Sequence, residues 1–271
     1  MARRGERGQA ALDVVGATGR GAYEFLAQMG GIWRLWWDTT GAVGLATVRR
    51  KVIDRRAVAR QMVETGVRSI PITTLLNFFV GLILAMQTSY QLKKFGAVSY
   101  VPGLVGVSMV RELGPLLAAV IISGRIGAAI AAEIGTMVVN EEVDALKTMG
   151  LRPVRYLVAP RLIALMTMLP CLTILADTAG MFGGLLIGIT NLHLSWDFYW
   201  TKTFLTIVPK DVYTGSIKSV VFGALIGLIS CRMGLSVTGG AEGVGRATTR
   251  AVVLASIAIL ISDFFLTKIL Y

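Results

Sequence analysis

The 271-residue sequence is strongly apolar and basic, which restricts the classes of protein to which it can belong. Hydrophobic residues make up 54% of the chain and charged residues only 16%, and the net charge is +11. Soluble domains carry about a quarter charged residues, so this composition predicts an integral membrane protein. The basic excess lies mostly in residues 1–68 and indicates a cytoplasmic segment facing anionic lipid heads, in preference to nucleic-acid binding.

The N-terminal region, residues 1–68, is predicted to lie in the cytoplasm and partly at the membrane surface. Within it, Arg20–Thr40 places Trp33, Trp36 and Trp37 on an apolar face, and charged residues fall on the other side. Tryptophan is enriched at the headgroup boundary, so the pattern predicts a helix lying in the cytoplasmic interface. An amphipathic helix packed against protein is the alternative.

Five apolar segments within residues 69–271 are long enough to cross about 30 Å of hydrocarbon. The predicted spans are Ile70–Leu92, Val105–Val139, Leu162–Thr190, Val212–Cys231 and Ala251–Leu270. The sequence therefore predicts an all-α, multi-pass membrane protein whose N-terminus is inside and whose C-terminus is outside. Between the fourth and fifth spans, Arg232–Arg250 is predicted to form a glycine-rich cytoplasmic loop.

The second span contains four charged residues, namely Arg111, Glu112, Arg125 and Glu133. On a continuous helix these residues fall within roughly 140° of arc. A charge facing lipid costs about 2.5 kcal/mol or more, so we expect one shared polar face turned away from lipid. We expect Arg125 and Glu133 to pack as a pair, whereas Glu112 can pair with a cation from a neighbouring helix. Pro115 is expected to make the first turn irregular.

The third span carries a stripe of small residues. Gly180, Gly184 and Gly188 recur at every fourth position, which predicts close contact with another helix. Asp177 in the same span and Asp263 in the fifth span are expected to have structural roles.

A short amphipathic segment, Asn140–Met149, lies between the second and third spans. Asn140 can cap it, and the acidic residues that follow favour the positive N-terminal end of a helix. The segment carries too much charge to span, and the arginines after it place it in the cytoplasm. A helix of this kind can receive a push from a separate motor domain; an incidental surface helix is the alternative.

Motifs for catalysis or ATP binding are missing from the sequence. It contains no GxxxxGK[ST] phosphate loop, and the glycine-rich run 239–245 follows a span rather than a strand. The single histidine, His193, has no cluster of ligands around it in the sequence, so no catalytic residue, metal site or cofactor is predicted. ATP hydrolysis would therefore have to occur on a partner chain.

Several motifs resemble the MlaE-type permease family of MCE-associated lipid ABC transporters. The matching runs are Arg111–Pro115, Ser123–Arg125, Ala132–Gly135, Glu142–Leu146, Met149–Gly150, Pro160–Arg161, Ile217–Ser219, Gly245–Thr249 and Asp263–Phe264. They follow one register from about Arg55 to the C-terminus. The resemblance implies a homodimeric permease in the inner membrane, two cytoplasmic ABC ATPase subunits, a STAS-domain protein in some members, and an MCE-domain oligomer outside. It also implies movement of phospholipid between the inner membrane and the cell envelope.

The resemblance further assigns residues to two sites. The coupling helix of the family corresponds to Asn140–Met149, where we expect Val143 and Leu146 to anchor the ATPase. The full set of expected ATPase contacts is Glu141, Glu142, Val143, Asp144, Leu146 and Met149. The lipid pocket of the family lies between two permeases, near the first and fifth spans. Its polar rim would use Arg111, Glu112 and Lys218, with Lys218 contacting the lipid head. Its apolar floor is expected to come from Leu75, Leu82, Met86, Leu254 and Ile261.

Two other functions are compatible with the residues. An ion-coupled secondary transporter or proton channel would also place charges in the membrane, but it would work without an ATPase. A non-transporting scaffold could anchor partners through the basic N-terminal helix, although a mere anchor gains nothing from the cost of intramembrane charge. Copurification of an ATPase with lipid-stimulated hydrolysis would separate the three functions.

Overall fold

The computed structural model describes residues 55–271 together with Gly30 and Trp37. The predicted interfacial helix Arg20–Thr40 lies outside the described residues, apart from these two. The prediction of an all-α membrane protein is confirmed, because five helical stretches in the described part are long and apolar enough to cross a membrane. These stretches are Arg55–Lys93, Val98–Val139, Val154–Thr190, Pro209–Leu235 and Gly240–Leu270.

The first stretch consists of a polar helix followed by an apolar one. Helix α2 (Arg55–Thr65) leads through a 3-10 turn (Val67–Ser69) into α3 (Ile70–Lys93). Pro71 lies in the first turn of α3, where its missing N–H leaves no hydrogen bond unmade. The apolar helix therefore begins where it was predicted, but a helical extension precedes it.

The second stretch is helical throughout but is not a continuous α-helix. After a 3-10 turn it contains, in order, α4 (Val101–Ser108), a π-helical segment (Met109–Leu113), α5 (Gly114–Ile122), a second π-helical segment (Ser123–Gly127) and α6 (Ala128–Val139). The first π segment ends two residues before Pro115, whose ring would clash with the carbonyl four residues earlier in a regular α-helix. The expected irregularity at Pro115 is thus a widened turn.

The segment between the second and third stretches contains the short helix α7 (Glu142–Thr148). Asn140 does not cap it as predicted, because the residue at the cap position is Glu141, in a left-handed conformation with φ 60°. The third stretch then begins with a π-helical segment (Val154–Val158) and continues as α8 (Ala159–Thr190). The third helical stretch therefore starts at Val154, eight residues before the predicted start of the third span at Leu162.

The last part of the chain is more helical than predicted. Helix α9 (Trp196–Thr206) precedes α10 (Pro209–Leu235), and α11 (Gly240–Leu270) follows after a short turn. The predicted loop over Arg232–Arg250 is wrong, because most of it is helix. Gly239 turns the chain with φ 87°, and an ion pair of 2.8 Å between Glu242 and Arg246 supports the first turns of α11.

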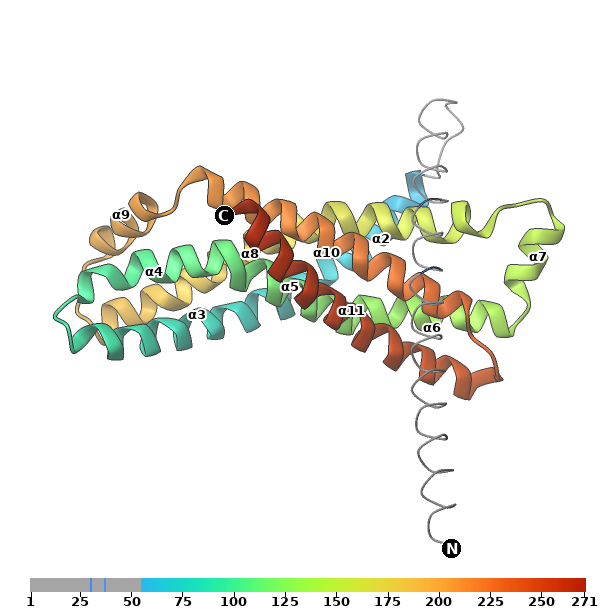
Figure 1. The fold of residues 1–271 in the computed structure, drawn as a ribbon, viewed down its shortest axis with the longest axis horizontal. Coiled ribbons are helices and arrows are strands. Elements are labelled where there is room, and N and C mark those ends of the chain that lie inside the picture. The colour runs from blue at the N-terminus through green and yellow to red at the C-terminus, as the bar shows by residue number, and fades with distance from the viewer. Residues whose placement is uncertain (1–29, 31–36, 38–54) are drawn as a thin grey trace, which may run out of the picture.

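The helices form an elongated bundle, with α7 at one end of its long axis and α9 near the other (Figure 1). Helix α8 lies in the centre and packs against α2, α3, α5 and α10. The main core fills the space between α5, α8 and α10. Its fully buried side chains include Ile122, Leu165, Leu169, Phe222 and Ile226.

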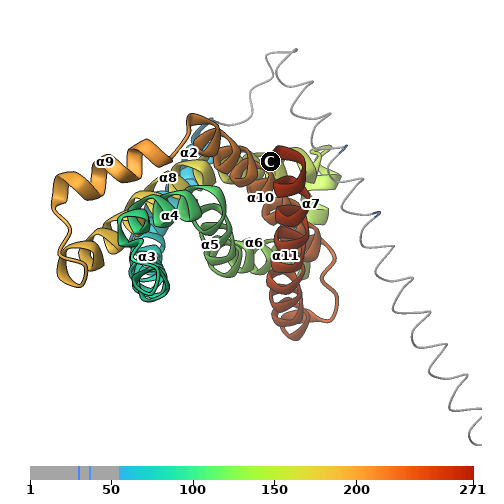
Figure 2. The same cartoon turned by 60° about the vertical axis from the view of Figure 1, so that its left-hand side comes forward.

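Helices α3 and α11 flank α5, which contacts both of them (Figure 2). Each of the two flanking helices buries one narrow stripe and leaves a wide apolar face exposed. The buried stripes are Thr73, Asn77, Gly81, Ala85 and Ser89 on α3, and Gly243, Ala247, Ala251, Ala255 and Ile259 on α11. Small side chains at these positions let the helix backbones approach closely.

The predicted glycine stripe on α8 is indeed a close-contact surface. A Cβ atom added to Gly81 of α3 would overlap the backbone of Gly180. A Cβ atom added to Gly188 would lie 2.7 Å from Tyr199 Cδ2, so this glycine makes room for the α9 ring. The stripe therefore holds α3 on one side and α9 on the other.

Candidate functional site: a polar cluster within the bundle

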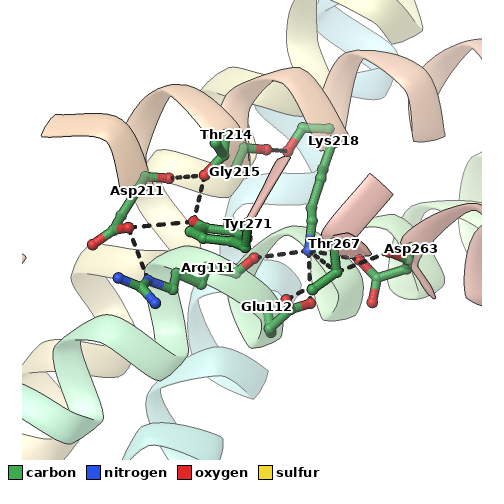
Figure 3. Close-up of polar contacts among 10 residues, drawn as sticks. Arg111, Glu112, Asp211, Thr214, Gly215, Lys218, Asp263, Thr267 and Tyr271 are labelled. Carbon is green, nitrogen blue, oxygen red and sulfur yellow. Dashed lines mark hydrogen bonds and ion pairs between the residues drawn. The ribbon is translucent and has the colours of Figure 1, made fainter. Parts of the chain in front are cut away.

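Charged side chains from three separate segments meet inside the bundle (Figure 3). The first π segment, α10 and the C-terminal end of α11 each contribute. The members are Arg111, Glu112, Asp211, Thr214, Lys218, Asp263, Thr267 and Tyr271. The structure therefore brings together all three residues predicted for the polar rim.

Lys218 is at the centre of this cluster and is completely buried, with 0% of its side chain exposed. Its Nζ lies 2.7 Å from Glu112 Oε2 and 3.0 Å from Asp263 Oδ1. It also donates to the Thr267 hydroxyl at 2.7 Å. An ammonium group has three N–H donors, and Lys218 directs them to Glu112, to Thr267 and to a backbone carbonyl, while Asp263 adds an ion pair. Lys218 therefore has no donor left for a lipid head, so it does not have the position expected of a residue that contacts lipid.

The hydrogen bond from Lys218 to the backbone carbonyl follows from the position of Pro115. Because proline has no backbone N–H, the carbonyl of Arg111, four residues earlier, cannot receive the usual helical hydrogen bond from it. Lys218 Nζ lies 3.1 Å from that carbonyl oxygen and donates to it. A buried carbonyl without a partner would cost about 1–3 kcal/mol. The lysine therefore compensates for the proline in the neighbouring span.

Arg111 occupies the edge of the cluster and remains 38% exposed. Its Nε donates to Asp211 Oδ1 at 2.8 Å, and its guanidinium carbon lies 4.7 Å from the centre of the Tyr271 ring. Tyr271 also donates to Asp211 Oδ1 at 3.3 Å. Among the residues that the structure describes, none is a partner of the two terminal nitrogens of Arg111. This guanidinium is thus fixed in place but keeps donors available.

The remaining charges of the second stretch do not share one face with this cluster. Arg125 donates to Ser69 at 2.6 Å and lies 3.8 Å from Glu64, whereas Glu133 pairs with Arg161 of α8 at 2.8 Å. The predicted Arg125–Glu133 pair is therefore wrong, and so is the single polar face. The physical reason is the two π segments, each of which adds a residue to a turn and rotates the next part of the helix about its axis.

The apolar residues predicted for the pocket floor divide into two groups within one protomer. Leu82 packs with Ala85, Val105 and Met109, while Leu254 packs with a separate cluster that includes Ala251 and Met233. Leu75, Met86 and Ile261 have exposed side chains. One chain by itself does not assemble these residues into a single floor, so a common pocket would need a second copy.

The predicted ATPase contacts on α7 differ in their exposure. Val143 is 4% exposed and therefore faces the interior of the permease, not a partner. Leu146 is half-buried, whereas Met149 is 65% exposed. The acidic residues Glu141, Glu142 and Asp144 are exposed, and Asp144 pairs with Lys147 at 2.7 Å. Met149, directly after α7, is thus the most exposed apolar side chain of the predicted set.

Sequence reasoning missed Asp211, Thr214, Thr267 and Tyr271 as members of the polar cluster. A usable signal existed for Asp211, which follows Pro209 at the start of a span and accepts from the Val208 backbone N–H at 3.1 Å. Thr267 and Tyr271 give no comparable signal, because their roles depend on where α11 ends in space. Within residues 55–271 no group of three His, Cys, Asp or Glu side chains is arranged to hold a metal ion.

Comparisons with known proteins show the family to which this chain is similar. The family model described as "Permease MlaE" matches residues 58–269. A "Probable ABC transporter permease protein" of Rickettsia typhi is 40% identical over 260 residues, which cover 96% of this chain and 98% of the relative. A protein of the same description from Synechocystis is 41% identical and covers 86% of this chain and 88% of its own. The chloroplastic protein TRIGALACTOSYLDIACYLGLYCEROL 1 of Arabidopsis thaliana is 36% identical, covering 85% of this chain and 66% of that protein.

Proposed function

Since the chain belongs to the MlaE permease family and is a transporter permease subunit, we propose that it moves phospholipid and is driven by ATP hydrolysis on a separate chain. The proposed location is the inner membrane, with the N-terminus in the cytoplasm and lipid passing between that membrane and the cell envelope. The basic residues before the first span support this orientation.

The position of Arg111 is the observation that carries the lipid proposal. Its half-exposed guanidinium stacks near Tyr271, directly after the end of α11. The last turns of α11 expose Ile261, Phe264 and Ile269. A phosphate could accept from the free nitrogens of Arg111 while acyl chains lie along this apolar face, which is the combination that an amphiphilic ligand needs.

Glu112 and Lys218 have a different role in this proposal from the one expected of them. They hold the π segment, α10 and α11 together through ion pairs, and so they orient Arg111 rather than bind lipid themselves. The exposed faces of α3 and α11, which carry Leu75 and Ile261, supply acyl-chain contact across a proposed homodimer interface. Pairing two copies would bring together apolar residues that one chain keeps apart.

Energy would reach the permease through α7. This helix projects at one end of the bundle, between the second and third stretches, where a cytoplasmic ABC ATPase could engage it (Figure 1). Met149 is the proposed apolar anchor, Leu146 contributes its exposed part, and the acidic residues form the rim. A STAS-domain protein on the same side and an MCE-domain protein on the outer side complete the proposed assembly.

The lipid proposal is tested by changing Arg111 without removing its charge. Arg111→Lys keeps a cation for Asp211 but loses the planar pair of terminal donors, so bound phospholipid per assembled protein should fall roughly tenfold. Arg250→Lys, an exposed position on α11, is the matched control. Phospholipid would be quantified by mass spectrometry after purification. Equal occupancy in both variants, at equal assembly, would remove Arg111 from the lipid site.

The proposal that an ABC ATPase drives transport through contact with α7 is tested by a substitution at this contact. Met149→Asp should abolish copurification of an ABC ATPase and lipid-stimulated ATP hydrolysis, because a charge would replace the apolar anchor. Leu205→Asp on α9 makes the same kind of change at an exposed position near the opposite end of the molecule and should have no effect (Figure 1). An ATPase that still copurifies with Met149→Asp would show that this residue is not the anchor.

One observation favours an ion-coupled transporter as the alternative. Asp177 is 8% exposed, and its Oδ1 has no hydrogen-bond partner among the described residues, as expected of a carboxyl group that takes up a proton. Transport into vesicles that follows a proton gradient without ATP, and that is lost in Asp177→Asn, would support this alternative over the ATP-driven one.

A further inference from the structure

A half-open cavity of about 520 Å³ lies between α2, α6 and the start of α8, well away from the polar cluster. Arg161 lines it, and Thr173, twelve residues further along α8, contacts Ser219 beside Lys218. At 1.5 Å per residue the cavity therefore lies roughly 18 Å along the bundle from the level of Lys218. It is a separate feature of the molecule, closer to the α7 end.

The lining of this cavity is strongly cationic. Arg56, Arg60 and Arg161 contribute three positive charges, and Glu133 contributes one negative charge, which leaves a net charge of +2. Gln61 and Tyr156 add neutral hydrogen-bonding groups. Arg60 makes no hydrogen bond or ion pair with any residue that the structure describes. A concave surface with this charge attracts an anion.

Arg161 is the best-defined part of the site because it is 5% exposed and held in one orientation. One terminal nitrogen donates to the Leu157 carbonyl at 2.8 Å, and the other lies 2.8 Å from Glu133 Oε2. Its Nε is buried and has no partner among the described residues. A buried donor without a partner costs about 1–3 kcal/mol, so this group favours an acceptor beyond those that the described residues supply.

We propose that this cavity binds the phosphate group of an anionic phospholipid head. Phosphate offers several acceptor oxygens, and arginine is the side chain that matches them best. The apolar run that begins at Leu162 follows Arg161 directly, so the cavity lies where the third span leaves the hydrocarbon. A lipid could therefore keep its acyl chains in the bilayer while its head occupies the cavity. This site is independent of the one proposed around Arg111.

Photo-crosslinking inside the cavity tests the proposal on the full-length protein. Tyr156 lines the cavity and is exposed, so Tyr156→p-benzoyl-phenylalanine places a crosslinker there without removing a buried group. The protein would be placed in nanodiscs that contain either phosphatidylglycerol or diacylglycerol with the same acyl chains. Adducts would be identified by mass spectrometry. We expect adducts with phosphatidylglycerol to exceed those with diacylglycerol severalfold.

The arginine dependence is measured in the same assay. Arg60→Gln should lower the phosphatidylglycerol adduct about fivefold, the effect of about 1 kcal/mol for one basic residue near a membrane. Arg55→Gln removes the same charge from an exposed position of α2 outside the cavity. It should change the amount of phosphatidylglycerol adduct less than about twofold. Arg161 is left unchanged, because its side chain is buried in the bundle and replacing it would disturb the packing of α8.

Whether the cavity holds a lipid head or a free phosphate ion is decided by adding inorganic phosphate or chloride to the crosslinking assay at constant ionic strength. If inorganic phosphate lowers the phosphatidylglycerol adduct and chloride does not, the cavity is a phosphate site that a soluble anion occupies. If neither ion lowers it, the lipid head is the ligand. Equal adducts from the two lipids, or equal effects of Arg60→Gln and Arg55→Gln, would overturn the proposal.

Discussion

Replacing Lys218 by methionine should destabilise the bundle through uncompensated charge rather than through lost volume. The substitution keeps an unbranched side chain of similar length but removes both ion pairs, at 2.7 Å to Glu112 and 3.0 Å to Asp263. It also removes the hydrogen bonds to Thr267 and to the Arg111 carbonyl, which add a smaller loss that neutralising the carboxylates does not restore. Removing one partner of a buried ion pair typically lowers the free energy of unfolding by about 3–5 kcal/mol. The Glu112 side chain is 35% exposed and can partly rehydrate, so we expect the lower end, about 3 kcal/mol.

The free energy of unfolding of the purified protein would be measured by denaturant titration in mixed micelles. Lys268→Met, at an exposed position near the end of α11, is the matched control and should change it by less than about 0.5 kcal/mol. Neutralising the stranded carboxylates, in the triple variant with Glu112→Gln and Asp263→Asn, should recover a large part of the loss.

Two results would refute this reasoning. A Lys218→Met protein as stable as the Lys268→Met control would show that the ion pairs contribute nothing measurable. A triple variant less stable than Lys218→Met alone would show that the loss comes from shape or hydrogen bonding and not from unpaired charge. A stable Lys218→Met protein that lost its phospholipid would return this residue to the lipid site.

Two further predictions concern packing and topology. Gly81→Ala should lower the free energy of unfolding by roughly 1–3 kcal/mol, because the added methyl overlaps the Gly180 backbone. Gly124→Ala, where a Cβ meets nothing within 4 Å, should leave stability unchanged or slightly raised in the same titration. In a chain without its native cysteines, a cysteine at Lys202 of α9 should react with an impermeant reagent from outside, and one at Thr148 of α7 only from inside. Labelling of both positions from the same side would contradict the proposed topology.

Much of the fold could be predicted because a membrane imposes a strict length and composition on anything that crosses it. The apolar runs predicted five helices, and the start of α3 at Ile70 was placed correctly. The glycine period on α8 predicted a close helix contact that the structure places against α3 and α9. These are local properties, and periodicity and hydropathy report them directly.

The partners of the charged residues could not be predicted in the same way. Arg111, Glu112, Arg125 and Glu133 were projected onto one regular helix, but two π segments intervene and turn them toward different neighbours. A π turn changes the angular position of every residue after it, and no pattern in the sequence measures that rotation. Pro115 indicated one irregularity but not its size.

The sequence by itself therefore determined the class of protein, the number of spans and the residues whose charge had to be turned away from lipid. Only the tertiary structure decided that Lys218 is enclosed while Arg111 stays accessible. It also decided that Arg161 lies in a cationic cavity. The physical reason is that burial and hydrogen-bond capacity depend on which helices meet at a given depth. That depends on helix crossing and rotation, which the order of residues along a single helix does not specify.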